Sequence, residues 1–154
     1  GRVMAAGSVN DVFSRRDLRH YTGKFEASVV LHARVVARDE AAGLMVLDHP
    51  AGRLSVPLTG AMVGSIARVR IRARDVAIAI GDPGNISIRN RLSGTIREIH
   101  AMEGANVEVR LDAGGEPLIA RITAPAATAL GLKEGQPVVA LIKASAFDRL
   151  DDFA

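Results

Sequence analysis

The sequence predicts a mainly β protein made of two small tandem barrels, and three observations carry this prediction. Runs of alternating or β-branched residues follow one another between residues 25 and 147, separated by glycine-containing turns. The second half of the chain repeats the pattern of the first. One short helical segment, "TAPAATALGL", interrupts the second half only.

The expected strands fall into two sets. Residues 25–82 form the first barrel, with strands "ASVVLHARVVARDE", "GLMVLDH", "GRLSVPL" and "ARVRIRARDVAIAI". Residues 83–148 form the second, with strands "NISIRN", "GTIREIHAM", "ANVEVRLDA", "EPLIARIT" and "QPVVALIKASAF". Residues 149–154 are expected to be a C-terminal tail.

Equivalent glycines indicate that the two sets are copies of one unit. Gly52 and Gly115 lie 63 residues apart, whereas Gly64 and Gly135 lie 71 apart. The separation grows by about the length of the extra helix. Small five-stranded units are typical of Greek-key barrels of the OB type. Because a chain of about 60 residues buries only about 60% of its unfolded surface, we expect the copies to pack together or subunits to exchange strands, and we expect a dimer.

The helical segment has the signals of a complete short helix. Thr123 is placed to cap its N-terminus, and Pro125 lies in its first turn, where a missing N–H is tolerated. Gly131 can close the helix in the left-handed conformation. We therefore expect one helix between the last two strands of the second barrel.

Residues 1–24 have a different character. "GRVMAAG" is a short strand ending in a turn, and Ser8 can cap a helix in which Val9, Val12 and Phe13 have helical spacing. A lone strand and helix cannot bury their own apolar face, so this segment is expected to be the tail of a larger unit.

Composition excludes several classes of protein. The 154 residues are 48% hydrophobic and 24% charged, as in a soluble globular chain, with a formal charge of +3 that favours anionic partners. No apolar run is long enough to span a bilayer, and the N-terminus is not a signal peptide. The absence of cysteine excludes disulfides and thiolate metal sites and fits the cytoplasm.

Catalytic signatures are also missing. No GxxxxGK[ST] phosphate loop occurs, and the four histidines, which lack metal-ligand spacing, are expected to be solvated surface groups: His20, His32, His49 and His100. Pairs such as Asp39–Glu40 do not form a recognisable acid–base site. We therefore predict no catalytic residues, no metal ligands and no enzymatic activity in this chain.

The basic run "RVRIRAR", from Arg68 to Arg74, raises the possibility of nucleic-acid binding. Single-strand binding barrels pair a basic groove with aromatic stacking platforms. Every aromatic residue here lies outside residues 26–146, so the arginines are better interpreted as the solvent face of a strand.

The segment "NISIRNRLSGTIREI", from Asn85 to Ile99, alternates as a half-buried strand does and places Ser87, Arg89 and Arg91 on one face. Together with later motifs it resembles the Mop domain of the TOBE group, from about Ile86 to Phe147. The motifs are Ser-x-Arg-Asn-x-Leu-x-Gly-Thr at 87–95, Leu-Gly-Leu-x-x-Gly-x-x-Val at 130–138 and Ile-Lys-Ala-Ser at 142–145.

The resemblance implies an oxyanion site. In that family the serine and arginine of the first motif and the lysine of the last bind molybdate or tungstate, where subunits or repeated domains meet. Carried over, this implicates side chains and backbone donors of Ser87, Arg89, Lys143, Ala144 and Ser145, with Thr123 as a nearby hydroxyl. Asn90 is expected to serve the turn, and Arg91 to be surface charge.

One departure from the family pattern is visible. Binding members often carry a serine at the position of Ala126, and some an arginine at that of Ala129. The retained residues still suit a tetrahedral dianion, because arginine, lysine, hydroxyl and backbone N–H groups are all donors. A donor-only cage also disfavours hydrogen phosphate, whose proton would lack an acceptor.

The N-terminal segment "GRVMAAGSVNDVFSRRDL" is similar to the last strand and helix of bacterial ABC-transporter ATPase domains. The order of parts then resembles the C-terminal regulatory region of ATP-binding subunits of molybdate importers. This implies a cytoplasmic homodimer at the inner face of the membrane, a membrane permease partner, molybdate or tungstate as ligand, no other cofactor, and ATP only in an upstream domain. Bound oxyanion would inhibit transport. The alternatives are a stand-alone molybdate storage protein and a nucleic-acid-binding barrel.

Overall fold

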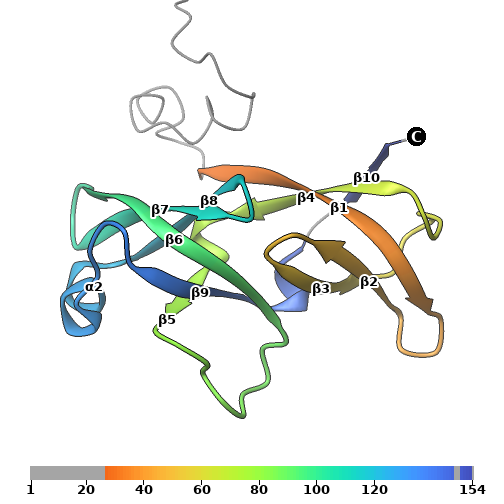
Figure 1. Cartoon of the computed structure of the whole chain (residues 1–154), viewed down its shortest axis with the longest axis horizontal. Coiled ribbons are helices and arrows are strands. Elements are labelled where there is room, and N and C mark those ends of the chain that lie inside the picture. The colour runs from red at the N-terminus through yellow and green to blue at the C-terminus, as the bar shows by residue number, and fades with distance from the viewer. Residues whose placement is uncertain (1–26, 148–149, 154) are drawn as a thin grey trace, which may run out of the picture.

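The computed structural model describes residues 27–147 and 150–153 (Figure 1). The expected N-terminal strand and helix lie outside this range. The first half contains β1 (Ser28–Asp39), β2 (Leu44–His49), β3 (Gly52–Pro57), β4 (Ile66–Arg72), the 3-10 turn η2 (Ala73–Asp75) and β5 (Ala77–Ala79). The second contains β6 (Asn90–Ala101), β7 (Asn106–Ala113), β8 (Glu116–Thr123), α2 (Ala124–Leu130), β9 (Pro137–Ile142), the 3-10 turn η3 (Ala144–Ala146) and β10 (Leu150–Phe153).

The fold is mainly β, with two curled sheets of the OB type, as the sequence predicted. The sheet orders are β10-β4-β1-β2-β3 and β5-β9-β6-β7-β8, with antiparallel pairing throughout. Strand alternation follows the sequence: Val29, Leu31, Ala33 and Val35 of β1 are buried and their neighbours are not. No helix in the described ranges is long and apolar enough to cross a membrane.

The helix α2 forms as predicted. Thr123 Oγ1 accepts a hydrogen bond from Ala126 N at 3.2 Å, and a proline lies in the first turn. Gly131 closes the helix with a φ of 64°, in the left-handed region. The local sequence therefore determines both ends of this element.

The internal repeat is visible in the hydrogen bonds. The order β4-β1-β2-β3 matches β9-β6-β7-β8, and the long strand of each set has a register shift, after Val35 and after Ile96. Gly64 N donates to Val35 O, and Gly135 N donates to Ile96 O, both at 2.8 Å. We call strands β1–β4 the first lobe and strands β6–β9 the second lobe.

The fifth strand of each sheet follows the strands of the other lobe in the sequence. After η2 the chain crosses over, and β5 pairs with β9; after η3 it crosses back, and β10 pairs with β4. β5 falls within the predicted range 25–82, and β10 within the predicted tail 149–154. Strands are thus exchanged between the two lobes of one chain, whereas the exchange considered from the sequence was between subunits. The lobes are joined by two sheets rather than by a linker.

Three predicted strands are shorter than expected. "ARVRIRARDVAIAI" is divided by η2, where Val76 N donates to Ala73 O at 3.2 Å and turns the chain. "QPVVALIKASAF" ends at Ile142 and continues as η3. "NISIRN" is not a strand before Asn90, because the β6–β9 ladder ends at the pair Asn90–Ile142. Ser87 and Arg89 therefore precede β6 rather than lying within it.

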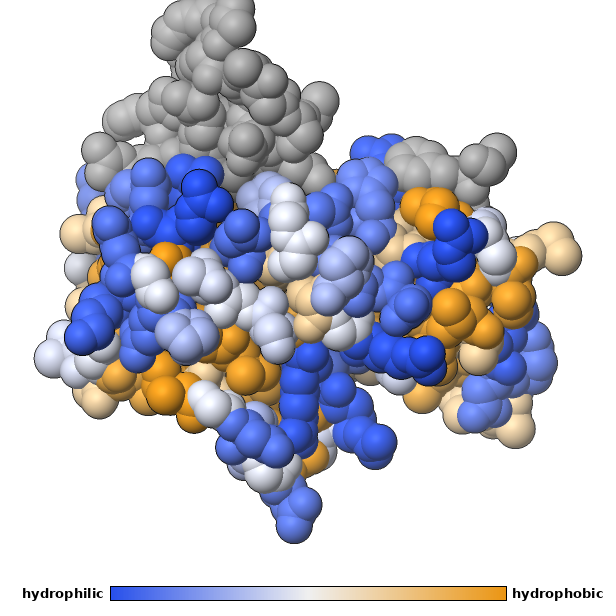
Figure 2. Space-filling view, in the orientation of Figure 1, coloured by the Kyte–Doolittle hydropathy of each residue, from blue (hydrophilic) through white to orange (hydrophobic). Residues whose placement is uncertain are grey.

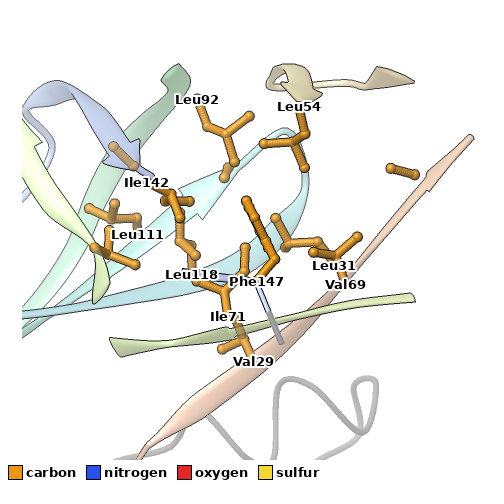
Figure 3. Packing of buried hydrophobic residues seen from close by; sticks show 14 of the residues in the cluster. Val29, Leu31, Leu54, Val69, Ile71, Leu92, Leu111, Leu118, Ile142 and Phe147 are labelled. Atoms are coloured by element: carbon orange, nitrogen blue, oxygen red, sulfur yellow. The ribbon is translucent and has the colours of Figure 1, made fainter. Parts of the chain in front are cut away.

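One hydrophobic core serves both lobes. Buried residues from β1, β3, β6 and β8 form a single cluster, and Figure 3 shows Phe147 among side chains of both lobes, near Leu31, Ile71 and Leu118. Each fully buried leucine of this kind contributes about 2 kcal/mol. The shared core provides the burial that a barrel of about 60 residues lacks alone. On the face shown in Figure 2, hydrophilic residues alternate with hydrophobic patches.

A histidine–glutamate cluster, His32–Glu116–His49, joins the lobes. Glu116 of β8 accepts hydrogen bonds from His32 N at 3.0 Å, His32 Nδ1 at 2.7 Å and His49 Nε2 at 2.9 Å. His49 Nδ1 accepts from Ala51 N at 3.0 Å, so Nε2 carries the hydrogen donated to Glu116. The prediction that the histidines are surface groups is wrong for His49, whose side chain is 0% exposed.

This cluster perturbs the carboxyl group. Burial by itself raises the pKa of Glu116, but hydrogen bonds from the His49 ring and from the backbone and ring of His32 outweigh it and lower the pKa to about 2. The charged form of Glu116 is therefore stabilised by folding, and with it the contact between β8 and the first lobe.

Gly52 allows close approach of the lobes. A Cβ at this position would lie 2.7 Å from Arg91 O and 3.3 Å from Leu92 Cδ2, and the φ of Gly52 is +152°. We expect Gly52→Ala to lower the free energy of unfolding by about 2 kcal/mol, measured by chemical denaturation. Gly43, at φ +72° with nothing near its hypothetical Cβ, is the control: Gly43→Ala should cost only about 1 kcal/mol. Equal costs for the two variants would contradict close approach as the cause.

Candidate oxyanion-binding site

Two residues of the first motif, Asn90 and Arg91, form hydrogen bonds that stabilise the fold. Asn90 is 1% exposed; its Oδ1 accepts from Ser55 N at 2.6 Å and its Nδ2 donates to Ser55 O at 3.0 Å. It was expected to serve a turn, but it instead joins β6 to the edge strand β3 of the other lobe.

Arg91 holds the loop before β6. Its guanidinium donates to Asp82 Oδ1 at 2.9 Å, to Gly84 O at 2.7 Å and to Ile88 O at 3.3 Å. Its role is therefore more specific than the expected surface charge. With its hydrogen bonds committed to the loop, Arg91 is a structural residue, and it supports the segment that carries Ser87 and Arg89.

Arg89 and Lys143 occupy neighbouring positions at the end of one ladder. Asn90 pairs with Ile142, and the next residues along the two strands are Arg89 and Lys143. Both are exposed, and neither side chain forms a hydrogen bond or ion pair with any other residue in the described ranges. Each of the two cations is thus the residue next to the last pair of the ladder, outside the paired strands β6 and β9.

The remaining predicted residues lie around this pair in different ways. Ser87 is exposed two residues before Arg89, and Ser145 is exposed in η3, which begins at Ala144 directly after Lys143. Thr123 is exposed at the end of β8, where its hydroxyl oxygen caps α2 and leaves its proton available to donate. Among the described residues, no hydrogen bond joins Thr123 to Arg89 or Lys143.

A cavity of about 410 Å³ opens beside Lys143, where the lobes meet. Its walls come from η2 and β5, from the strand β8, and from the end of β9. The lining residues include Ile88 and Lys143 from the predicted motifs and two further cations, Arg74 and Arg121. Sequence reasoning assigned Arg74 to the solvent face of a strand, and it gave Arg121 no role, although "ARIT" is one of the stretches that resemble the Mop domain.

Acidic groups near the cavity are fewer than the basic ones. Asp75 also lines it and lies 3.8 Å from the guanidinium of Arg72. Glu108, which is 1% exposed, lies 3.9 Å from the guanidinium of Arg121. Among the residues that line the cavity, Arg74, Arg121 and Lys143 are basic and Asp75 is acidic.

Comparison with known proteins adds to this geometry. Residues 86–147 match the model of the TOBE domain. The chain is 42% identical over 149 residues to the molybdenum import ATP-binding protein ModC of Mesorhizobium japonicum, and 40% identical over 149 residues to that of Rhodospirillum rubrum. These matches include 97% and 94% of this chain but only 40% of each relative, so the chain spans about two fifths of their length.

A solved structure has a similar fold. The cytoplasmic molybdate-binding protein ModG, in a crystal form with molybdate bound, superposes with a TM-score of 0.70 at 28% identity. The match covers 79% of this chain and 93% of ModG. Residues 86–147 thus match the TOBE domain, and nearly the whole chain is similar to a part of the molybdenum import ATP-binding proteins.

Proposed function

We propose that this chain binds molybdate or tungstate and serves as the regulatory part of a molybdate importer's ATP-binding subunit. The observation that carries the proposal is the adjacency of Arg89 and Lys143 at the end of the β6–β9 ladder, without a neutralising partner among the described residues. The names of the relatives and the molybdate in the ModG crystal support the choice of ligand.

The chemistry of the proposed ligands suits an oxyanion without a proton. Arg89 and Lys143 offer charge-assisted hydrogen bonds, and Ser87, Thr123 and Ser145 add hydroxyl donors, with backbone N–H near Ala144. Molybdate carries two negative charges and only acceptor oxygens, whereas hydrogen phosphate would present its proton to donors and lose a hydrogen bond.

The regulatory step is a linkage between two equilibria. Molybdate bound by the paired regulatory parts of a homodimer would inhibit uptake if it binds the inactive arrangement of the transporter more tightly than the active one. ATP would bind only in an upstream domain, and the permease would be the partner at the cytoplasmic face of the membrane. Exposed apolar side chains at Met62, Val63 and Ile80 support self-association.

The alternative is a stand-alone molybdate-binding protein, which the similarity to ModG favours. The two functions share one site and differ in what surrounds it. The match to import ATP-binding proteins extends over 97% of this chain, against 79% for ModG. This longer match makes the transporter subunit our choice.

Calorimetric titration tests the proposed site. We expect the wild-type chain to bind molybdate and tungstate more tightly than sulfate or phosphate. Arg89→Ala and Lys143→Ala should each weaken molybdate binding at least about tenfold, because each removes a charge-assisted hydrogen bond worth about 1.5–3 kcal/mol.

The control is Arg53→Ala. Arg53 is exposed on β3, 3.6 Å from Asp48, and its replacement lowers the net charge equally without touching the proposed site. Its molybdate affinity should stay within about twofold of the wild type. Tight binding that survives both Arg89→Ala and Lys143→Ala would refute the site.

A further inference from the structure

The loop that carries Ser87 and Arg89 has little side-chain packing to fix it. It spans residues 80–89 between β5 and β6, most of its residues are exposed, and in Figure 1 it projects away from both sheets. We propose that Asp82 and Arg91 are positioning residues of the oxyanion site, which order this loop before the anion binds. The inference rests on the proposed function and adds two residues that shape its site without being ligands.

Arg91, the second residue of β6, contacts the loop at three points. Its Nη1 donates to Asp82 Oδ1 at 2.9 Å, its Nη2 to Gly84 O at 2.7 Å and its Nε to Ile88 O at 3.3 Å. Because the guanidinium is a rigid plane, its N–H groups fix these acceptors relative to β6. Asp82 Oδ1 also accepts from Gly84 N at 2.9 Å. One carboxylate oxygen therefore joins the loop both to itself and to Arg91.

The contact with Ile88 acts on the binding segment directly. Ile88 lies between Ser87 and Arg89, so the hydrogen bond from Arg91 to Ile88 O orients the peptide group that precedes Arg89. Ile88 also lines the cavity that Lys143 lines, which places this segment beside another predicted ligand. The conformation of the segment is thus set by contacts within the protein.

Ordering the loop in advance should raise the affinity for the anion. The entropy cost of fixing the backbone of one residue changes an equilibrium constant by about 5- to 30-fold. If only the anion ordered the loop, this cost would be subtracted from the binding free energy. The contacts of Asp82 and Arg91 transfer the cost to folding.

Asp82 gives the sharpest test, because charge and positioning predict opposite results. A carboxylate repels a nearby anion, so electrostatics alone predicts that Asp82→Ala binds molybdate more tightly. Positioning predicts weaker binding, because the variant lacks the acceptor for Arg91 and for Gly84 N. The side chain of Asp82 is 80% exposed, and an exposed ion pair contributes little to global stability, so the variant should fold.

Calorimetric titration of the 154-residue chain with molybdate measures these effects. Asp82→Ala should weaken binding at least about fivefold, whereas Asp82→Asn, which keeps an acceptor oxygen, should stay within about twofold of the wild type. Arg91→Lys keeps the charge but loses the planar donor set, and should also weaken binding at least about fivefold. Asp48→Ala is the matched control, because Asp48 is an exposed carboxylate 3.6 Å from Arg53; its affinity should change by less than about twofold.

Amide hydrogen exchange separates positioning from a general loss of structure. Without ligand, residues 84–89 should exchange faster in Asp82→Ala than in the wild type, while β6 and β9 keep their protection. Molybdate should then slow exchange in residues 84–89 more in the variant, because the anion itself orders the loop.

The outcomes distinguish this inference from the proposed function. Wild-type or tighter molybdate binding in Asp82→Ala, together with a loss in Lys143→Ala, would overturn the positioning role and leave the proposed function standing. A loss in Asp82→Asn as large as that in Asp82→Ala would also overturn it, because the acceptor oxygen is retained. No molybdate binding by the wild type would overturn both.

Discussion

Glu116→Ala is expected to lower the free energy of unfolding by about 3 kcal/mol at pH 7. The change removes the acceptor for three hydrogen bonds at once, two from His32 and one from His49. The Nε2–H of His49 is then left without its acceptor in a buried position, which costs about 1–3 kcal/mol by itself. Urea denaturation of both proteins measures the difference.

The difference in stability between the wild type and Glu116→Ala should become smaller as the pH falls. Because folding depresses the pKa of Glu116 from 4.5 to about 2, its contribution is fully present above pH 4.5 and is lost as the pH falls toward 2. After a discount for partial solvent screening, this charge contribution is about 2 kcal/mol. The stability gap between wild type and Glu116→Ala should therefore narrow by most of this amount between pH 5 and pH 2.5.

Two variants separate the charge from the hydrogen bonds. Glu116→Gln keeps an acceptor oxygen but cannot titrate in this range, so its gap to Glu116→Ala should stay nearly constant with pH. Glu103→Ala, at an exposed glutamate, should change stability by less than about 0.5 kcal/mol. A gap between wild type and Glu116→Ala that stays constant between pH 5 and 2.5 would mean that the cluster does not stabilise the carboxylate.

Much of the fold follows from local sequence signals. Glycines at 52, 64, 115 and 135 mark equivalent turns, and each has a positive φ in the structure. Thr123 and Gly131 define the ends of α2 as predicted. These features depend on one or two residues each, so a single sequence reveals them.

The crossing of strands between lobes could not be predicted in the same way. β5 has three residues, Ala77–Ala79, and β10 has four. Segments this short carry no periodic signal, and their pairing with β9 and β4 is set by the chain's direction after η2 and η3. The partner of a strand is a non-local property, and alternation predicts only which face of it is buried.

Two buried polar residues did have a usable signal. His49 continues the alternation that buries Met45 and Leu47 in β2, and Asn90 shares a face with the buried Leu92 in β6. Period-two alternation thus predicts that both side chains point inward. For a polar side chain this implies a hydrogen-bonding partner, and in both cases the partner belongs to the other lobe.

The residues of the first motif differ in their roles. Asn90 and Arg91 form hydrogen bonds within the fold, whereas Ser87 and Arg89 are exposed. A structural role was expected from the sequence for Asn90, but no specific role was expected for Arg91. That Arg74 and Arg121 line one cavity with Lys143 could not have been predicted, because this depends on the packing of η2 against β8.

Asn90→Ala is expected to cost about 3 kcal/mol of stability. The Asn90 amide satisfies both Ser55 N and Ser55 O on the edge strand β3, at 2.6 and 3.0 Å, in a position that is 1% exposed. Alanine would leave this N–H and C=O without their partner, at about 1–3 kcal/mol each, and would open a small cavity. Chemical denaturation measures the loss. Asn85→Ala, at an exposed asparagine in the loop before β6, should cost less than about 0.5 kcal/mol.

Asn90→Asp separates the two hydrogen bonds of this contact, the one that Asn90 accepts from Ser55 N and the one that it donates to Ser55 O. Aspartate has nearly the same shape and can still accept from Ser55 N, but its carboxylate faces Ser55 O, where asparagine donates. We expect a loss at least as large as that of alanine at pH 7, and a partial recovery at acidic pH, when a protonated carboxyl can donate again. Because Arg89 is the adjacent residue, both variants should also weaken molybdate binding. A stability loss below about 1 kcal/mol in Asn90→Ala would show that the lobes do not depend on this amide for their contact.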